Sequence, residues 1–335
     1  MLKNLVSGLL IFASIGYTLT VDSSEKKNVI IDTDVDIDDL LQMIYLLDHP
    51  KVNVLAITTT SNGKTHYEYC GKNLHSVLKR FGREKIPIAR TTQPPLEFNG
   101  FYPEPIREKS DHLYGLNIDV EEGEYEALSS SDLMIQKLLE SKENVTLICN
   151  GPMTNLARAL KKEPQIKQYI DQVIVVGGAL NTKGNLTQKY NGFYNKVAEY
   201  NLFLDGKGAE VVLNSGLPII LIPLDVLAGV DCLTSEIYRH LLKSAKSPFS
   251  SFFIYANTCA HQDRFCINKS ITFISLIAAC SLLYPEIMEM PYLKLKLTTD
   301  FGPYYGMLSL DRSGFLAKVC LKINYEELIE KLSIP

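Results

Sequence analysis

Short apolar runs alternate along most of the chain with longer segments in which apolar residues recur at helical spacing. Apolar runs of about four to eight residues are typical of buried strands, and helical spacing is typical of a helix with one buried face. Their alternation predicts a mainly parallel sheet flanked by helices, because parallel strands need a crossover connection. The predicted strands cover residues 29–31, 52–59, 86–89, 145–149, 173–176 and 219–222, and the predicted helices cover residues 38–47, 66–81, 131–141, 154–161 and 208–214.

Segment 91–123 interrupts this alternation. It is rich in proline and turn residues and is long for a connection inside a compact domain. Loops of this length are commonly lids or substrate-facing insertions. No Pro/Gly linker divides the middle of the chain, so we expect a single α/β domain over residues 28–335, closed by strands at 292–297 and 318–323 and a helix at 324–332.

The first predicted strand ends in a dense group of acidic residues: Asp32, Asp34, Asp38 and Asp39, with Asp36 between them. Ligands of open α/β sheets bind at the carboxyl ends of the strands. Two carboxylates about 4 Å apart repel by about 4 kcal/mol at an effective dielectric of about 20, so such a group needs a neutralising partner. Calcium fits best, because it takes about six to eight oxygen ligands in loose geometry.

Three other interpretations compete with a calcium site. A helix N-cap explains Asp36 or Asp38 alone, but not the whole group. An EF-hand loop also begins Asp-x-Asp-x-Asp, yet Ile37 stands where that loop requires a turn glycine. A phosphoaspartyl phosphatase places Asp-x-Asp after an apolar strand and is the runner-up enzyme class, although Asp36 replaces the Thr or Val expected there.

Composition narrows the class of partner. The chain of 335 residues is 46% hydrophobic, ample for a large core, and its formal net charge is -4. No basic stripe provides the electrostatic footprint of a nucleic-acid binder. We therefore expect a small-molecule partner and no nucleic acid. Seven cysteines are an odd number, so at least one stays unpaired within the chain, and no disulfide is assigned.

The pattern of residues at the N-terminus predicts that the protein is exported. Lys3 precedes an apolar segment at 5–17 that is too short for a stable membrane span, so residues 1–20 are interpreted as the signal peptide of a secreted protein that has no membrane attachment after cleavage. An uncleaved membrane anchor is the alternative. Secretion is compatible with three glycosylation sequons, which begin at Asn144, Asn185 and Asn268.

Two later motifs carry polar side chains that can bind a ligand. In the motif at 150–155, which follows a predicted strand, Thr154 or Asn155 can cap the next helix. Glu199 and Asn201 point to one side if the backbone there is extended. A carboxylate and a carboxamide so placed suit a sugar diol, because the first accepts hydrogen bonds and the second both donates and accepts them. A turn with a cap and a solvated strand edge are the plain alternatives.

Together these segments resemble the nucleoside hydrolase family, calcium-dependent N-ribohydrolases that favour inosine, uridine and related nucleosides. The resemblance implies an α/β fold and hydrolysis of the N-glycosidic bond of a ribonucleoside, to free base and ribose, by a calcium-activated water. Relatives are commonly dimers or tetramers, so a homo-oligomer is an open alternative. The matching segments are residues 32–39, 55–59, 150–157, 176–178, 198–201, 214–219, 224–226, 306–307 and 311–312.

The resemblance also implies roles for individual residues. Asp34 matches the residue that binds calcium and takes a proton from the attacking water, and Asp39 and the backbone carbonyl of Asn150 match further metal ligands. The residues that match ribose-binding positions are Asp38, Glu199 and Asn201, with Asn195 joining them from the preceding loop.

Three positions depart from the family pattern. Val35-Asp36 replaces Pro-Gly, and Ser61-Asn62-Gly63 reverses the usual Gly-Asn, which leaves Asn62 as a candidate ribose contact. The late helix that normally begins His-Asp begins Ile274-Ser275. Ser275 then replaces a metal-binding carboxylate with a neutral oxygen, and Asp263 is the alternative donor.

These departures leave two hypotheses. The first is a secreted nucleoside N-ribohydrolase, which the intact Asp34, Asp38, Asp39, Glu199 and Asn201 favour. The second, which Ser275 favours, is a catalytically weak or inactive relative that binds a nucleoside or another ribose-bearing ligand. Base preference stays open, because the chain has no Trp to stack on a purine and the other aromatic residues near the expected mouth give no single candidate.

Overall fold

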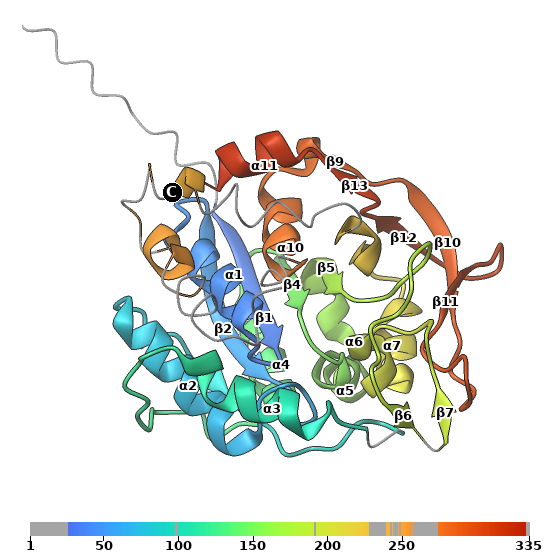
Figure 1. Cartoon of the computed structure of the whole chain (residues 1–335), viewed down its shortest axis with the longest axis horizontal. Helices are drawn as coiled ribbons and strands as arrows, with labels where there is room; N and C mark the ends of the chain where they lie inside the picture. Colours follow the sequence, from blue (N-terminus) through green and yellow to red (C-terminus); the bar gives the residue numbers. More distant parts are fainter. Residues whose placement is uncertain are drawn as a thin grey trace, which may run out of the picture.

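The computed structural model describes residues 26–97, 100–190, 192–227, 239–241, 243, 247, 249–254, 256 and 274–332. Its centre is a nine-stranded sheet in the order β11-β10-β12-β8-β5-β4-β1-β2-β3 (Figure 1). Neighbouring strands from β12 to β3 run parallel, whereas β10 is antiparallel to β11 and to β12. The expected α/β domain with a mainly parallel, helix-flanked sheet is confirmed.

The elements have the following bounds. The sheet contains β1 (Lys27–Thr33), β2 (Val52–Thr59), β3 (Ile88–Ala89), β4 (Val145–Cys149), β5 (Ile170–Val176), β8 (Ile219–Ile222), β10 (Tyr292–Leu297), β11 (Leu308–Leu310) and β12 (Phe315–Val319). Two short pairs lie outside it, namely β6 (Lys189–Tyr190) with β7 (Phe193–Tyr194), and β9 (Met288–Glu289) with β13 (Lys322–Ile323). The α-helices are α1 (Ile37–Asp48), α2 (Tyr67–Arg80), α3 (Glu104–Asp111), α4 (Ser130–Glu140), α5 (Thr154–Lys162), α6 (Tyr200–Leu204), α7 (Gly206–Leu213), α10 (Ile274–Leu283) and α11 (Tyr325–Lys331). The short 3-10 helices are η1 (Leu113–Gly115), η2 (Pro164–Tyr169), η3 (Leu224–Leu227) and η4 (Pro285–Ile287).

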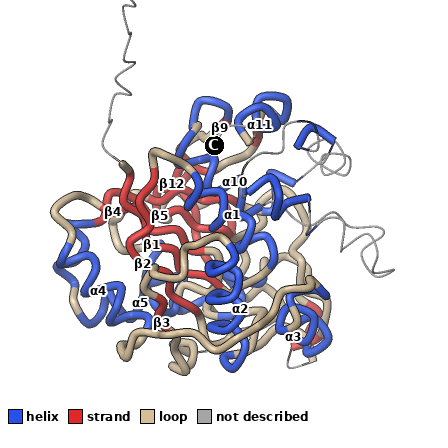
Figure 2. The backbone as a smooth tube through the Cα atoms, turned by 90° about the vertical axis from the view of Figure 1, so that its left-hand side faces the viewer, coloured by secondary structure: helices blue, strands red, loops and turns tan. Residues whose placement is uncertain are grey.

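Helices cover both faces of the sheet (Figure 2). Successive side chains of a strand point to opposite faces. Val29 and Ile31 of β1 accordingly join one core cluster with residues of α1, α2 and α10, while Ile30 joins a second cluster with residues of α4, α5 and α7. Helix α1 packs against α10. The first turn of α10 therefore lies beside the acidic loop that precedes α1.

Strand register brings three loops together. Asp32 of β1 lies opposite Thr58 of β2 and Cys149 of β4. The carboxyl ends of these parallel strands are therefore level, and the segments that follow them meet at one edge of the sheet. This edge is where ligands of open α/β sheets bind.

Several predicted strands keep their predicted bounds, including 52–59, 145–149, 219–222 and 292–297. Strand β3 begins at Ile88 instead of residue 86, because Pro87 has no N–H for the sheet ladder. The predicted strand at 318–323 is divided, since β12 ends at Val319 and β13 pairs with β9 in a separate sheet.

Two local predictions were wrong. Glu199 is extended, but Tyr200 and Asn201 are not, because the chain enters α6 at Tyr200 and Glu199 accepts hydrogen bonds from the first free amides of that helix as its N-cap. Neither Thr154 nor Asn155 caps α5, because Met153 holds the N-cap position.

The insertion at 91–123 folds against the acidic loop. The hydroxyls of Thr65 and Ser110 both donate to the backbone carbonyl of Val35, at 2.9 and 3.3 Å. Because Ser110 belongs to α3 in the insertion, these bonds fix α3 and η1 next to the carboxyl end of β1. The insertion thus faces the site, as its length predicts.

Some expectations lie outside the described residues: the signal peptide at 1–20, Asp263 and the sequon at Asn268. Within the described ranges, Cys70, Cys149, Cys280 and Cys320 are buried free thiols. In the same ranges, every helix is too short or too polar to cross a membrane.

Candidate active site

The acidic loop after β1 is held in a sharp turn. Val35 adopts a left-handed conformation with φ 63°, which is a true outlier for a β-branched residue. Its N–H donates to the Thr33 hydroxyl at 2.9 Å, and its carbonyl accepts the two hydroxyl bonds from Thr65 and Ser110. The turn lets α1 start at Ile37 and directs the carboxylates of the loop and of the first helical turn into one cavity.

This cavity lies at the carboxyl end of the sheet and has a volume of about 70 Å³. A water molecule takes about 30 Å³ of the liquid, so this volume suits a cation with one or two waters. Segments far apart in the sequence line it: Asp34, Asp36, Asp38, Asp39, Lys64, Tyr102, Asn150, Val176, Asn185, Glu199, Asn201, Leu224, Leu227, Ile274 and Ser275.

Burial makes these carboxylates unusual acids. It raises the pKa of Asp34 to about 7, against the charge of Lys64, and the neighbouring Asp36 and Asp38 add to the increase. Burial and adjacent carboxylates likewise raise the pKa values of Asp38 and Asp39 well above the ordinary range. Charged carboxylates in this position need a cation or a shared proton.

Asp36 differs from the other three. Burial alone would raise its pKa, but the charge of Lys64 and hydrogen bonds from Lys64 and Tyr114 hold the pKa below its ordinary value. Asp36 occupies the N-cap position of α1, yet its side chain makes no capping hydrogen bond. Helix capping therefore does not explain this aspartate, which instead pairs with Lys64.

Ser275, at the start of α10, lies inside the oxygen-lined cavity. Its hydroxyl is 2.8 Å from Oδ1 of Asp39 and 3.0 Å from Oδ2 of Asp38. Gln42 of α1 donates to the Ser275 carbonyl at 2.5 Å and exchanges hydrogen bonds with the side chain of Asn150. Gln42 therefore ties α10 and the segment after β4 to α1.

Glu199 and Asn201 reach the cavity from α6. The Glu199 carboxylate accepts from the N–H groups of Gly178, Asn201 and Leu202. Asn201 Nδ2 donates to the carbonyls of Asn150 and Val176, at 2.8 and 3.0 Å, and its Oδ1 lies 3.3 Å from the Tyr102 hydroxyl. The expected pairing of these two side chains in one site is present, although a helix start produces it instead of an extended strand.

Two proposed ribose contacts do not line the cavity. Asn62 is buried and donates to the carbonyls of Gly100 and Leu204. Asn195 accepts from the N–H groups of Val197 and Ala198 and donates to the Tyr305 carbonyl. Both side chains thus hold loops together behind the site.

Sequence reasoning missed Lys64, Tyr102 and Asn185. The Asn185 Oδ1 accepts from the Tyr200 N–H at 2.9 Å, beside Glu199. The available signals were weak: Asn185 was noted as a sequon, and Lys64 follows the Gly63 of the reversed Gly-Asn pattern. Neither signal reveals proximity to the acidic loop before the fold is known.

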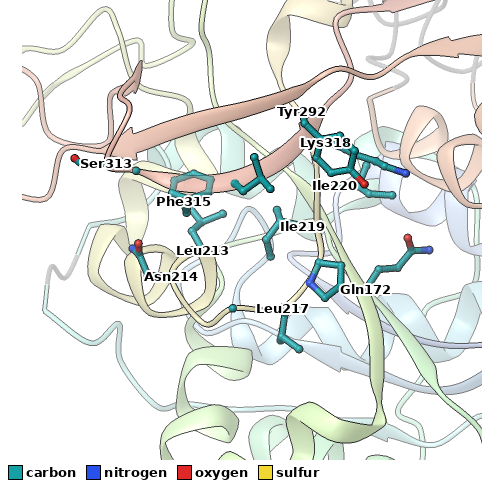
Figure 3. Close-up of a pocket in the computed structure, with 14 residues that line it drawn as sticks. Gln172, Leu213, Asn214, Leu217, Ile219, Ile220, Tyr292, Ser313, Phe315 and Lys318 are labelled. Atoms are coloured by element: carbon teal, nitrogen blue, oxygen red, sulfur yellow. The ribbon is translucent and has the colours of Figure 1, made fainter.

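A larger cavity of about 480 Å³ lies at the opposite end of the sheet, near the amino end of β8 (Figure 3). Leu213, Leu217, Ile219 and Phe315 line it, together with a few neutral polar groups and Lys318. None of its lining residues is a carboxylate, histidine or cysteine. Its side chains therefore offer no carboxylate, imidazole or thiolate to bind a metal.

The donor set in the acidic cavity suits a hard cation. The available donors are the carboxylates of Asp34 and Asp39, the carbonyl of Asn150 and the hydroxyl of Ser275, all of them oxygens, which calcium and magnesium prefer. The charge of Asp34 also raises the pKa of Asp39, a repulsion that a shared proton or an intervening cation relieves. In the described ranges, no group of three or more acidic, histidine or cysteine side chains is arranged to hold a metal ion by itself, so neutral oxygen donors must complete a metal shell.

Comparison with curated proteins identifies hydrolase relatives. A pyrimidine-specific ribonucleoside hydrolase of Shewanella sp. (strain MR-7) is 29% identical over 214 residues, and the aligned part spans 64% of this chain and 64% of that relative's length. One of Shewanella baltica (strain OS185) is 28% identical over 305 residues, which are 87% of this chain and 89% of the relative.

Solved structures share the fold. The inosine-uridine preferring nucleoside hydrolase of Bacillus anthracis superposes with a TM-score of 0.75 at 21% identity, covering 92% of this chain and 99% of that one. The purine-preferring ribonucleoside hydrolase of Gardnerella vaginalis gives 0.72 at 21% identity, covering 92% and 97%. The sequence profile of inosine-uridine preferring nucleoside hydrolases matches residues 29–330. The chain therefore belongs to this nucleoside hydrolase family, whose members depend on a metal.

Proposed function

We propose that this protein hydrolyses the N-glycosidic bond of ribonucleosides to free base and ribose, with a calcium ion in the acidic cavity. One observation carries the proposal. Asp34, Asp38 and Asp39 converge with Glu199 and Asn201 in a single buried cavity at the carboxyl end of the sheet. These are the residues that the family resemblance assigns to metal, water and ribose.

Asp34 is the proposed general base. Lys64 N–H donates to its Oδ2 at 3.2 Å, which fixes the carboxylate at the cavity wall. A buried carboxylate whose pKa is raised towards neutrality is a competent proton acceptor. A bound calcium would orient a water molecule and lower its pKa. Asp34 would then take the proton of that water as its oxygen attacks the anomeric carbon.

The other polar side chains would hold and stabilise the sugar. Asp38, Glu199 and Asn201 present two carboxylates and a carboxamide to the cavity, a set suited to vicinal hydroxyls. Positive charge develops on the ribose ring as the glycosidic bond breaks. The same carboxylates stabilise that charge electrostatically in a cavity that excludes most water.

The proposed substrates are ribonucleosides, and we assign no preference for a particular base. The relatives and solved neighbours are named pyrimidine-specific, inosine-uridine preferring or purine-preferring, so the shared fold accommodates different bases. Each of these names is that of a hydrolase, which gives no support to a relative that binds nucleosides without cleaving them.

The direct test is turnover by the purified full chain with calcium, using inosine, uridine and cytidine. Free base is measured by chromatography and ribose by a reducing-sugar assay. We expect release of both, and a loss of about 100-fold or more in Asp34→Asn, because a positioned general base contributes at least that much. Asp171→Asn, at the exposed amino end of β5, is the matched control. No release from any of these nucleosides, together with calorimetric binding of one of them, would replace this proposal with the binding-only alternative.

We also propose that residues 1–20 are removed and that the protein is secreted. The charged and apolar order of this segment supports the proposal. N-terminal sequencing of protein recovered from the medium of expressing cells tests it, and a retained Met1 in secreted protein would contradict cleavage.

A further inference from the structure

Lys64 brings a positive charge into the acidic cavity. It is the one basic side chain among the described residues that line this cavity. Its ammonium forms an ion pair with Asp36, and its side chain is 24% exposed. The charge of Lys64 also acts on Asp34, Asp38 and Glu199. The ammonium of Lys64 therefore interacts electrostatically with most of the carboxylates in the cavity.

The backbone fixes this lysine against the catalytic loop. A Cβ on Gly63 would lie 2.2 Å from the Cβ of Asp34, so the chain can pass this close to Asp34 only with glycine at that position. The next two N–H groups both reach Asp34, from Lys64 to Oδ2 and from Thr65 to the backbone carbonyl, each at 3.2 Å. Lys64 consequently follows the glycine that packs on Asp34, and Asn62 is turned away.

Asp36 is held as the partner of Lys64. The Tyr114 hydroxyl donates to Asp36 Oδ1 at 2.5 Å, while Oδ2 accepts from Lys64. Tyr114 and the preceding Leu113 have left-handed backbone angles, with φ 54° and 50°, an unusual conformation for side-chain-bearing residues. The insertion thus keeps a strained turn that places Tyr114 on Asp36. Both Asp36 oxygens are thus engaged, one by Tyr114 and one by Lys64, so this carboxylate is held as the partner of the lysine.

The Asp36–Lys64 pair unites two departures from the family pattern. Asp36 replaces a glycine of the acidic motif, and Lys64 stands after the glycine that packs on Asp34, where the family pattern has asparagine. The two replacements are in direct contact. Asp36 alone would add one more carboxylate to the cluster, and its pairing with Lys64 avoids the cost of a buried charge without a partner.

We propose that Lys64 is a resident counter-ion of the active site: its ammonium stabilises the carboxylate cluster when no metal is bound and lowers the affinity of the cavity for a divalent cation. The proposal deepens the proposed function and depends on its calcium site. The ion pair with Asp36 holds the Lys64 ammonium among the other carboxylates that line the cavity. An ammonium and a dication in one small cavity repel strongly at the dielectric of a protein interior.

The test compares four variants of the full-length protein by calorimetric titration with calcium and by thermal unfolding in EDTA. Lys64→Met should bind calcium about tenfold or more tightly than the wild type and unfold at a lower temperature in EDTA. Asp36→Asn leaves the ammonium unmatched and should bind calcium about tenfold or more weakly. The double variant Lys64→Gln/Asp36→Asn restores the net charge, so its affinity should return close to that of the wild type. Lys72→Met is the control: Lys72 lies on α2, its exposed ion pair with Glu122 is lost in the variant, and neither measurement should change.

A purely structural lysine predicts a different pattern, in which Lys64→Met and Asp36→Asn both weaken calcium binding. That pattern, or a Lys64→Met protein that is folded and binds calcium no more tightly than the wild type, would overturn the proposal. If Lys64→Met does not fold in EDTA, the comparison of the other two variants decides: Asp36→Asn should bind calcium more weakly than the wild type, and the double variant should bind it about as tightly as the wild type. Failure of the proposed function appears separately, as calcium uptake by wild-type protein that cleaves no nucleoside.

Discussion

The Ser275 hydroxyl lies 2.8 Å from Oδ1 of Asp39, so the first turn of α10 places a neutral oxygen directly against a proposed metal-binding carboxylate. The family pattern has a carboxylate at this position. Packing of α10 on α1 and the Gln42 bond to the Ser275 carbonyl keep the serine in the cavity. The position expected for a metal ligand is therefore filled by a weaker donor, and a metal shell in this cavity would carry one negative charge less.

Ser275→Asp should tighten calcium binding by about tenfold or more, because it returns a negative charge to the cavity. In EDTA the same variant should be less stable than the wild type, since the new carboxylate faces Asp38 and Asp39 without a cation. Calorimetric titration and thermal unfolding measure the two effects. Ser275→Asn, which is similar in size but neutral, is the control, and equal calcium affinities in the Asp and Asn variants would contradict this role of the position.

Gln42→Leu should lower the free energy of unfolding by about 2 to 4 kcal/mol, because it leaves the buried amide of Asn150 and the Ser275 carbonyl without their partner. It should also weaken calcium binding, since Asn150 and Ser275 are both proposed ligands. Urea unfolding in EDTA and a calcium titration give the two values. Gln136→Leu, on the exposed face of α4, should change stability little. A Gln42→Leu protein of wild-type stability would show that these bonds do not organise the site.

Gly63→Ala should reduce kcat/KM by about 100-fold or more, because the new methyl group must displace Asp34 and small misplacements of reacting groups are costly. Gly302→Ala is a close control, since a Cβ there meets no atom within 4 Å and its φ is not left-handed. Steady-state kinetics on the same nucleoside compare the two. Similar kcat/KM values in both variants would mean that Gly63 does not position the catalytic carboxylate.

His49 should make the protein less stable as the pH falls. Its pKa is lowered by burial and by Lys51, and its Nδ1 accepts the Lys51 N–H at 3.2 Å, which requires the neutral ring. Because the folded pKa lies below the unfolded value of about 6.5, the unfolded chain binds more protons in this window. Stability is complete above about pH 6.5 and declines below it towards the folded pKa. His49→Gln should lose this part of the pH dependence of chemical unfolding, and an unchanged difference between pH 5 and pH 8 would contradict the assignment.

The sequence was sufficient where a local pattern determines the structure. The apolar run before Asp32 identified β1, and the aspartates at its end identified the edge of the sheet that holds the site. The sequence was insufficient where tertiary packing determines the local conformation. The turn after β2 is set by Gly63 against Asp34, which brings Lys64 into the cavity and turns the buried Asn62 away from it. Likewise, Glu199 looked like part of a strand because helix α6, which it caps, is short, and its further hydrogen-bond partner, the N–H of Gly178, is distant in sequence.

The loop before α6 shows the same limit. Asn195 and Asn185 are equally plausible from composition, but the β6–β7 pair separates them, and Asn185 alone lines the cavity. No spacing rule distinguishes a loop asparagine that binds backbone from one that faces a ligand.

The most direct test of the central claim is ribose release from inosine or uridine by the full-length protein before chelation, after removal of calcium with EGTA, and after calcium is restored. The account predicts release that stops on chelation, returns with calcium, and is nearly absent in Asp34→Asn under every condition. Release that persists unchanged after chelation, or in Asp34→Asn with calcium, would contradict it.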